Sequence, residues 1–299
     1  MNTDMVQNPG PETFDELLAE IRSRTLSPSH QKLAERVLSD PEAVAFMTVS
    51  ELATAAGVNE ATVVRFASGL GLKGYPGLTR LCQEHLREQA QLLRRFDSLE
   101  HLAAGSGALL GQTAALDQAN IARTFARIDD ATRESAVEHL ARAPRVHVMG
   151  LQKCHGPAYL LGYLLRMMRE DVETVDASFG SLTDELRRIR EDDCFVAMSI
   201  HRYSTDTVRA ARWARHVGAH VIAFTDNTSS PLAASAHDTF YIDASSASVL
   251  RSMTAFTSLA QAISGEVAQA LGHQARETLL EKENLLNTFA VYVTDRAES

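Results

Sequence analysis

The chain has 299 residues, of which 45% are hydrophobic and 22% charged, and its formal net charge is −9. This composition is typical of globular proteins and excludes a largely disordered or fibrous chain, while the length favours two domains. No run approaches the roughly 20 apolar residues that cross a bilayer, and the first residues lack the order of a signal peptide. We therefore expect a cytoplasmic protein that has no membrane partner.

The three cysteines, Cys82, Cys154 and Cys194, are odd in number and far apart in the chain. Neither a disulfide framework nor a zinc cluster is indicated by this spacing, and reduced thiols fit best. The net negative charge opposes nucleic-acid binding, because neutralising phosphates requires Lys and Arg. However, residues 61–83 carry three basic and no acidic residues, so a basic surface can exist on this acidic protein.

The first half of the chain has the spacing of successive helices. Apolar residues recur with helical period over residues 14–21 and 33–38, and Pro41 separates the second segment from the next. Residues 89–130 are polar and alanine-rich with helical periodicity, interrupted by Gly105, Ser106 and Gly107. This stretch predicts a helical linker between two domains.

The second half alternates short β-rich runs with helical segments. Strands are expected at 146–150, 193–200 and 219–226, with shorter ones at 172–175 and 239–242, and helices at 157–169, 205–217 and twice within 250–290. Such alternation favours a parallel sheet covered on both faces, which binds ligands beyond the carboxyl ends of its strands. Residues 151–155, 199–205 and 225–230 would therefore surround one crevice.

Residues 47–75 have the order helix, short turn with glycine, helix. Thr48 and Glu51 form a capping box, Gly57 ends the first helix, and Asn59 caps the second. This is the helix-turn-helix order, whose second helix enters the major groove of double-stranded DNA. The candidate DNA contacts are Thr48, Asn59, Glu60, Thr62, Val63, Arg65, Lys73, Tyr75 and Arg80, and the expected packing residues are Leu52, Ala53, Val58, Val64 and Phe66.

Two alternatives stay open for this motif. It is compatible with an ordinary helical hairpin whose Arg65 is solvated, although the basic cluster disfavours that interpretation. If the motif binds DNA, Arg65 either pairs with guanine or contacts phosphate, and the sequence does not separate these roles. Glu60 is unusual near DNA, where a carboxylate is tolerated mainly when it accepts from cytosine or caps a helix.

The segment from Leu26 to Leu78 resembles the N-terminal domain of the RpiR (MurR/RpiR) family of bacterial transcriptional regulators, including the run from Glu60 to Phe66 and the sequel from Gly71 to Tyr75. The resemblance extends from about Phe14 to Leu271. It implies an all-α helix-turn-helix domain followed by an α/β/α sugar isomerase (SIS) domain with a parallel five-stranded sheet. The expected parts are a DNA-binding domain at 13–88, the linker at 89–130, the SIS domain at 131–272, and a C-terminal helix and tail at 273–299.

The resemblance to SIS domains implies two ligand-binding turns. SIS domains that hold phosphosugars usually have a Gly-x-Gly-x-Ser turn after the first strand and a Ser-x-Ser-Gly-x-Thr turn later in the chain. This chain retains Gly150, Ser199 and Ser204, the last as a hydroxyl equivalent to Thr, but departs from the pattern at four positions: Gln152, Cys154, His201 and Arg202. Lys153, His201 and Arg202 would instead converge near a helix N-terminus and favour an anion. The candidate ligand-binding residues are Gln152, Lys153, Cys154, Ser199, His201, Arg202, Tyr203, Ser204 and Ser252.

Several of these residues have plainer interpretations. Arg202 and Tyr203 suit a salt bridge or a dimer contact equally well, and Cys154 is more simply a small residue in a turn than a reactive thiol. His155 and His201 have no third ligand at recognisable spacing, so we expect neither a metal nor a cofactor. Asp226 and Asn227 would lie at the crevice rim, and Ser229 and Ser230 precede Pro231 as at a helix start. Glu266 corresponds by analogy to a catalytic base, but a solvated face residue is the simpler interpretation.

The leading hypothesis is a regulator that binds a palindromic operator as a homodimer or dimer of dimers and senses a small anionic metabolite, such as a phosphosugar or sugar acid. The alternative is an SIS-type sugar-phosphate isomerase or lyase, for which the turns offer Lys153 and His201 but no convincing carboxylate pair. A third hypothesis is a sensor whose DNA-binding part has decayed, which the intact turn chemistry opposes. Without partner acids, we expect a protein that is not an enzyme.

Overall fold

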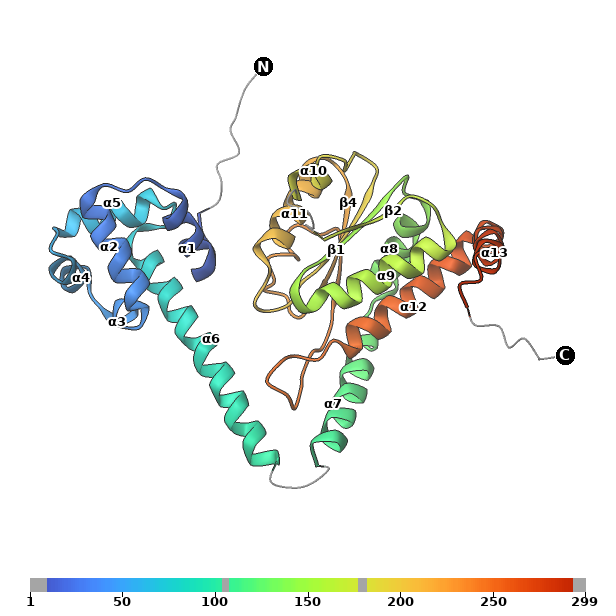
Figure 1. Cartoon of the computed structure of the whole chain (residues 1–299), viewed down its shortest axis with the longest axis horizontal. Coiled ribbons are helices and arrows are strands. Elements are labelled where there is room, and N and C mark those ends of the chain that lie inside the picture. The colour runs from blue at the N-terminus through green and yellow to red at the C-terminus, as the bar shows by residue number, and fades with distance from the viewer. Residues whose placement is uncertain (1–9, 104–107, 177–181, 293–299) are drawn as a thin grey trace, which may run out of the picture. The chain divides into compact units, whose positions relative to one another are not determined.

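The computed structural model describes residues 10–103, 108–176 and 182–292 (Figure 1). The chain divides near residue 101 into two compact units, which are described separately. The predicted break at Gly105, Ser106 and Gly107 lies outside the described residues. No helix among the described residues is both long and apolar enough to span a membrane.

The first unit is entirely helical in its described part. Its helices are α1 (Phe14–Ser23), α2 (Pro28–Ser39), α3 (Pro41–Phe46), α4 (Val49–Ala56), α5 (Glu60–Gly69) and most of α6 (Gly74–Ala103). Their apolar faces meet in one core, in which Leu17, Leu33, Leu52, Phe66 and Leu78 are nearly or fully buried. Proline at the first position of α2 and of α3, each after a capping side chain, explains why two separate helices form there.

Helix α6 runs without interruption past residue 88, where the first domain was expected to end, and it includes the first part of the expected linker. The following helix, α7 (Ala108–Phe125), belongs to the second unit. Its Asn120 side chain donates to the carbonyl of Ser245 at 2.7 Å, and its Arg123 pairs with Asp243 at 3.2 Å. Helix α7 is therefore joined to the rest of the second unit by polar contacts with residues far away in the chain. The sequence of α7 alone does not predict these contacts.

The second unit contains a five-stranded sheet in the order β2-β1-β3-β4-β5, and every neighbouring pair is parallel. The strands are β1 (Val146–Gly150), β2 (Val172–Val175), β3 (Cys194–Met198), β4 (His220–Thr225) and β5 (Asp238–Tyr241). All five lie where the β-rich runs predicted them. Strands β1, β3 and β4 are buried along nearly their whole length, and their side chains are mostly apolar, as expected for a parallel sheet covered on both faces.

Helices cover both faces of the sheet (Figure 1). One face carries α8 (Asp130–Arg142), α9 (His155–Met168) and α12 (Thr254–Leu271), and the other carries α10 (Leu182–Leu186) and α11 (Thr205–His216). Helix α13 (His273–Thr288) follows α12, and a single 3-10 turn, η1 (Gln152–Cys154), precedes α9. The expected α/β/α arrangement after an all-α unit is confirmed.

One local prediction is wrong. Ser229 and Ser230 do not begin a helix, because residues 228–235 form consecutive turns. The Ser230 hydroxyl is buried and accepts from the Thr225 hydroxyl at 2.6 Å, while the Asn227 side chain accepts from the backbone N–H of Ser229 at 2.9 Å. These side chains satisfy the backbone and hydroxyl groups of a tight loop, which competes with helix formation.

Candidate functional site

The helix-turn-helix is formed by α4, a turn, and α5. The capping box is present: Glu51 accepts from the Thr48 backbone N–H at 2.7 Å, and Thr48 Oγ1 accepts from the Glu51 backbone N–H at 3.3 Å. The Thr48 backbone N–H and, at 2.9 Å, the Thr48 hydroxyl both donate to the ionised carboxylate, and these two hydrogen bonds lower the pKa of Glu51. Gly57 ends α4 with φ 63°, a left-handed conformation that favours glycine, and Asn59 caps α5.

The cap of α5 extends into a side-chain network that reaches Arg65. Asn59 Oδ1 accepts from the backbone N–H of Thr62 at 2.9 Å and from its hydroxyl at 2.8 Å. The Thr62 hydroxyl in turn accepts from the Arg65 guanidinium at 3.1 Å. The arginine is exposed, yet its guanidinium is held against the first turn of α5. Such preorganisation reduces the entropy that a DNA contact would cost.

Burial divides the predicted contacts on α5 into two groups. Thr62 is 7% exposed and Val63 is fully buried. Val63 belongs to the core, so the prediction that its side chain contacts DNA is wrong. Val64, expected to pack inside, is instead 43% exposed. The exposed stripe comprises Glu60, Ala61, Val64, Arg65 and Ser68. Ala61, Val64 and Ser68 were missed, although their spacing of three and four residues around Arg65 is the signal of one helix face.

The remaining predicted DNA contacts lie around the start of α6. Lys73 and Arg80 are exposed, and Arg80 lies 3.5 Å from Glu84 in an exposed pair that contributes little to stability. Tyr75 is different: its hydroxyl donates to the carbonyl of Met47 at 2.7 Å, and burial raises its pKa to about 12. Tyr75 thus joins α6 to the segment before α4, and its one hydroxyl proton is already used. We therefore replace its expected phosphate contact with this packing role.

The second candidate site lies where β1, β3 and β4 end. The register pairs Gly150 with Met198 and Met198 with Phe224, so the segments that follow these three strands start side by side. Cys154 and Ile200 are both buried in the same core cluster, which brings the turn after β1 close to the segment after β3. The structure thus places Gln152, Lys153 and Cys154 on the same edge of the sheet as residues 199–204.

The turn after β1 keeps its shape despite the departures from the family pattern. A Cβ on Gly150 would lie 2.5 Å from the Cys154 carbonyl oxygen, so only glycine fits there. Gln152, which stands at the position of the second glycine, has φ 55°, a left-handed conformation that costs a non-glycine residue about 1 to 2 kcal/mol. A strained residue that is also exposed at the carboxyl edge of the sheet points to function. Cys154 is 2% exposed and burial raises its pKa to about 11, which favours its structural interpretation.

The segment after β3 is organised by hydrogen bonds to its own side chains. Ser199 is buried and its hydroxyl accepts from the Ser204 backbone N–H at 3.0 Å. Ser204 caps α11 by accepting from the Thr207 backbone N–H at 3.4 Å. Both hydroxyls therefore shape the turn, while Arg202 is exposed and His201 is half-buried beside it. Basic side chains and the N-terminus of α11 accordingly lie together at the carboxyl edge of the sheet.

A carboxylate also belongs to this edge, and sequence analysis placed it only at the rim. Asp226 Oδ2 accepts from the backbone N–H of His201 at 3.2 Å, and Oδ1 accepts from the Tyr203 hydroxyl at 2.9 Å. Burial and the negative charge of Asp226 raise the pKa of Tyr203 to about 12. Asp226 thus fixes the β3 segment against the β4 segment. The backbone N–H of His201, which lies near the expected anion position, therefore already donates to this carboxylate.

Ser252 and Glu266 lie in other surroundings. The Ser252 hydroxyl donates to Asp117 of α7 at 2.6 Å, and Thr254 donates to the same carboxylate at 2.8 Å. Ser252 therefore links the start of α12 to α7 in this structure. Glu266 on α12 pairs with Arg133 of α8 at 2.5 Å, which raises the pKa of the guanidinium. An ion-paired carboxylate is poorly suited to act as a catalytic base. Glu266 is also more than a solvated surface residue, because its ion pair joins α12 to α8.

Two family models match the chain. The rpiR-family helix-turn-helix domain matches residues 16–88, and the SIS domain matches residues 139–267. The curated transcriptional regulator HexR from Pseudomonas aeruginosa is 29% identical over 223 residues, which cover 73% of this chain and 75% of HexR. An uncharacterized regulator of the same type from Caldanaerobacter subterraneus is 26% identical over 236 residues, 78% of this chain and 82% of that protein.

Solved structures are also similar to this chain. The sugar isomerase domain of an RpiR transcription factor from Sphaerobacter thermophilus is 26% identical, with a TM-score of 0.57, over 59% of this chain and 98% of that one. The NanR protein of Vibrio vulnificus, solved in complex with ManNAc-6P, is 18% identical with a TM-score of 0.51 and aligns over 91% of this chain and 98% of its own. The NanR similarity shows that the fold is shared across nearly the whole chain.

Proposed function

Because the chain belongs to the RpiR family of helix-turn-helix regulators that carry an SIS domain, we propose that it reads operator DNA through α5 and senses a small anionic metabolite. The observation that carries this proposal is the exposed face of α5, on which Arg65 is held by Thr62 and Asn59. A fixed guanidinium near the N-terminus of the second helix is suited to contact base edges or phosphate in the major groove.

The charge around α5 supports the same conclusion. Arg65, Lys73 and Arg80 are all exposed, and residues 61–83 contain no acidic residue, although Glu60 lies on the same exposed stripe as Arg65 and Glu84 pairs with Arg80 at 3.5 Å. This local excess of positive charge makes up for the formal charge of −9 of the whole chain, since counterion release depends on the phosphates contacted rather than on net charge. One reading helix makes few base contacts, so we propose a homodimer, or a dimer of dimers, on a palindromic site.

The basic side chains at the carboxyl edge of the sheet favour an anionic effector. Lys153, His201 and Arg202 lie on the carboxyl edge of the sheet, where α9 and α11 begin. Helix N-termini and guanidinium groups both favour carboxylates and phosphates. Asp226 already accepts the backbone N–H of His201, so the anion would depend more on basic side chains than on backbone donors. A phosphosugar, a sugar acid or a related anion fits this arrangement.

The enzyme alternative is weaker on this geometry. Glu266, the residue that analogy offered as a base, is ion-paired with Arg133, and the Asp226 carboxylate is occupied by His201 and Tyr203. General acid–base catalysis requires groups that are positioned to exchange protons with substrate. The curated relatives described above are named transcriptional regulators, which also favours a regulatory role.

Fluorescence anisotropy tests the proposal. The full-length protein is titrated into labelled DNA from its own upstream region and into unrelated DNA of equal length, each at two salt concentrations. We expect tighter binding to the upstream DNA that persists at the higher salt, because base contacts add to the salt-dependent phosphate term. Equal affinity for the two DNAs, both with and without a panel of sugar phosphates and sugar acids, would count against a sequence-reading regulator.

A further inference from the structure

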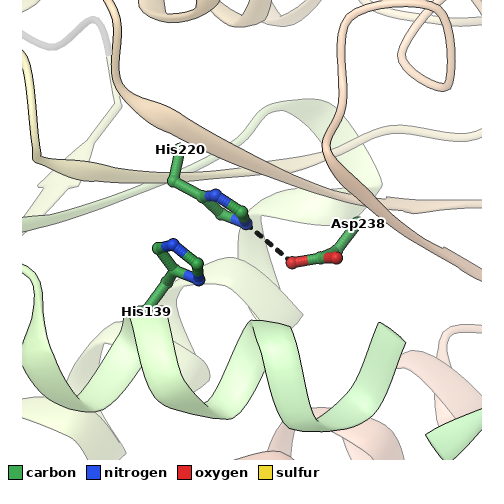
Figure 2. Close-up of side chains that lie close together, drawn as sticks. All are labelled: His139, His220 and Asp238. Carbon is green, nitrogen blue, oxygen red and sulfur yellow. Dashed lines mark hydrogen bonds and ion pairs between the residues drawn. The ribbon is translucent and has the colours of Figure 1, made fainter. Parts of the chain in front are cut away.

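A cluster of two histidines and one aspartate lies at the amino edge of the sheet, opposite to the edge that forms the crevice. His220 and Asp238 are the first residues of the parallel neighbours β4 and β5, and His139 comes from α8, which covers this face (Figure 2). One potential ligand atom from each residue lies within 4.8 Å of the other two. None of the three takes part in the DNA or effector sites described above.

The contacts within the cluster are close. His220 Nε2 lies 2.7 Å from Asp238 Oδ2, and the rings of His139 and His220 stack with centroids 3.4 Å apart and planes 10° apart, as Figure 2 shows. A neutral imidazole binds metal through the ring nitrogen that bears its lone pair, so the position of each ring proton decides which nitrogen can be a ligand.

Hydrogen bonds around the cluster orient its donor atoms. His139 Nδ1 lies 2.8 Å from the Ser135 carbonyl oxygen, which only accepts, so Nδ1 carries the proton and Nε2 bears the lone pair. The Ser135 hydroxyl donates to Asp238 Oδ2 at 2.9 Å. Metal-binding histidines usually donate their second N–H to a carbonyl or carboxylate, and metal-binding carboxylates are themselves hydrogen-bonded. Ser135 supplies both kinds of support from one turn of α8.

A third histidine lies beside the cluster but does not offer it a ligand atom. His237 stacks on His220 with centroids 4.4 Å apart, but its Nδ1 accepts from the Val221 backbone N–H at 2.9 Å. Its proton is therefore on Nε2, and neither nitrogen presents a lone pair to the cluster. The side chains of His220 and Asp238 are 14% and 8% exposed, so the cluster is largely shielded yet reachable from solvent.

We propose that His139 Nε2, His220 Nε2 and Asp238 Oδ2 bind one Zn²⁺ ion, with a water molecule as the fourth ligand. Imidazole and carboxylate ligands suit Zn²⁺ in tetrahedral geometry at about 2.0–2.2 Å. Binding moves the His220 proton from Nε2 to Nδ1, separates Nε2 from Oδ2 to roughly 3.3 Å, and opens the stack of His139 on His220. The ion would tie α8 to the first residues of β4 and β5, a structural role independent of DNA and effector binding.

The test uses full-length protein that has been stripped with a chelator, dialysed, and then equilibrated with Zn²⁺. Bound zinc is measured by atomic emission, and thermal unfolding is followed with and without Zn²⁺. We expect about one ion per chain and a Zn²⁺-dependent rise in Tm. His139→Gln and Asp238→Asn should each weaken binding by more than about tenfold, because loss of even an outer partner costs about 10- to 100-fold.

Two further variants separate the site from adventitious binding. Ser135→Ala leaves all three ligands in place and should weaken Zn²⁺ binding about tenfold, through loss of the hydrogen bond to Asp238. His216→Gln removes an exposed histidine of α11 and should leave binding unchanged. Substitution of Co²⁺ for Zn²⁺ should give visible d–d bands of tetrahedral coordination. If the wild type takes up no more zinc than a folded His139→Gln variant, one whose far-UV spectrum matches that of the wild type, the proposal is overturned.

Discussion

The Tyr203 hydroxyl donates a hydrogen bond to Asp226 Oδ1 at 2.9 Å, and this bond joins the segment after β3 to the segment after β4. The Asn227 amide donates to the same hydroxyl at 2.9 Å, so Tyr203 acts as donor and acceptor at once. Because the two segments lie side by side at the carboxyl edge of the sheet, the position of Arg202 and of the start of α11 depends in part on this contact. The hydrogen bond therefore helps to set the shape of the proposed effector site.

Tyr203→Phe removes that donor and acceptor while keeping the ring. We expect the free energy of unfolding of the SIS unit to fall by about 1 to 2 kcal/mol, because a part-buried carboxylate loses a hydrogen bond. Urea unfolding followed by fluorescence of Trp213 reports on this unit, since Trp213 is the only tryptophan and lies on α11. Tyr159→Phe is the matched control, because Tyr159 is 54% exposed. Equal loss in both variants would show that the Asp226 contact is not the cause.

The raised pKa of Tyr203 predicts a loss of stability at high pH. In the unfolded chain the hydroxyl ionises near its ordinary pKa of 10.0, whereas in the folded unit the pKa is about 12. Between these values the unfolded state binds fewer protons, so stability is complete below about pH 10 and declines as pH rises toward about pH 12. The decline should be shallower in Tyr203→Phe, measured as the urea midpoint at about pH 8 and about pH 11. Parallel curves for the two proteins would contradict the assignment.

Arg65→Ala should weaken binding to upstream DNA by roughly 5- to 100-fold, the range of one good base or phosphate contact. Thr62→Val keeps the shape of a buried side chain and removes the hydroxyl that accepts from Arg65, so we expect a smaller loss of affinity. Anisotropy titrations give both values, and Arg209→Ala on the exposed surface of α11 is the control for loss of charge.

The salt dependence of the Arg65→Ala titration distinguishes the two roles of this arginine. A phosphate contact would weaken binding to all DNA sequences alike and lower the salt slope by about 1, whereas a base contact would relax sequence preference. An affinity for upstream DNA equal to that of the wild type would remove Arg65 from the interface.

Much of the fold is local in origin and was predictable. The central strands β1, β3 and β4 are mostly apolar runs with glycine or charged residues close to their ends, and the caps Thr48, Asn59 and Ser204 act on backbone groups only three residues away. Such signals are contained in a short stretch of sequence. The exchange of Val63 and Val64 between core and surface shows the limit of that reasoning. Adjacent identical side chains differ only in the phase of the helix, which packing against α2 and α4 decides.

The sites depend on contacts between distant segments, and these were not predictable from spacing. Asp226 meets Tyr203 only because β3 and β4 are neighbours in the sheet. His139, His220 and Asp238 lie on three different elements, so no metal-binding pattern exists along the chain. Caps and turns can be predicted from polar residues a few positions apart. Sites whose residues come from different strands and helices can be predicted only once the strand order is known.

Gly150→Ala tests how closely the crevice is packed. An added Cβ would lie 2.5 Å from the Cys154 carbonyl oxygen and 2.8 Å from the Ala158 Cβ, so the turn after β1 must shift. We expect a loss of about 2 to 3 kcal/mol in the stability of the SIS unit, in the range found for overpacked interiors, and a weaker effector response. Gly265→Ala is the matched control, because a Cβ there meets nothing within 4 Å, and alanine within α12 should stabilise by about 0.5 to 1 kcal/mol. Trp213 fluorescence during urea unfolding measures both variants. If Gly150→Ala unfolds at the same urea concentration as the wild type, the turn is more pliable than its close contacts imply, and its glycine is not required by packing.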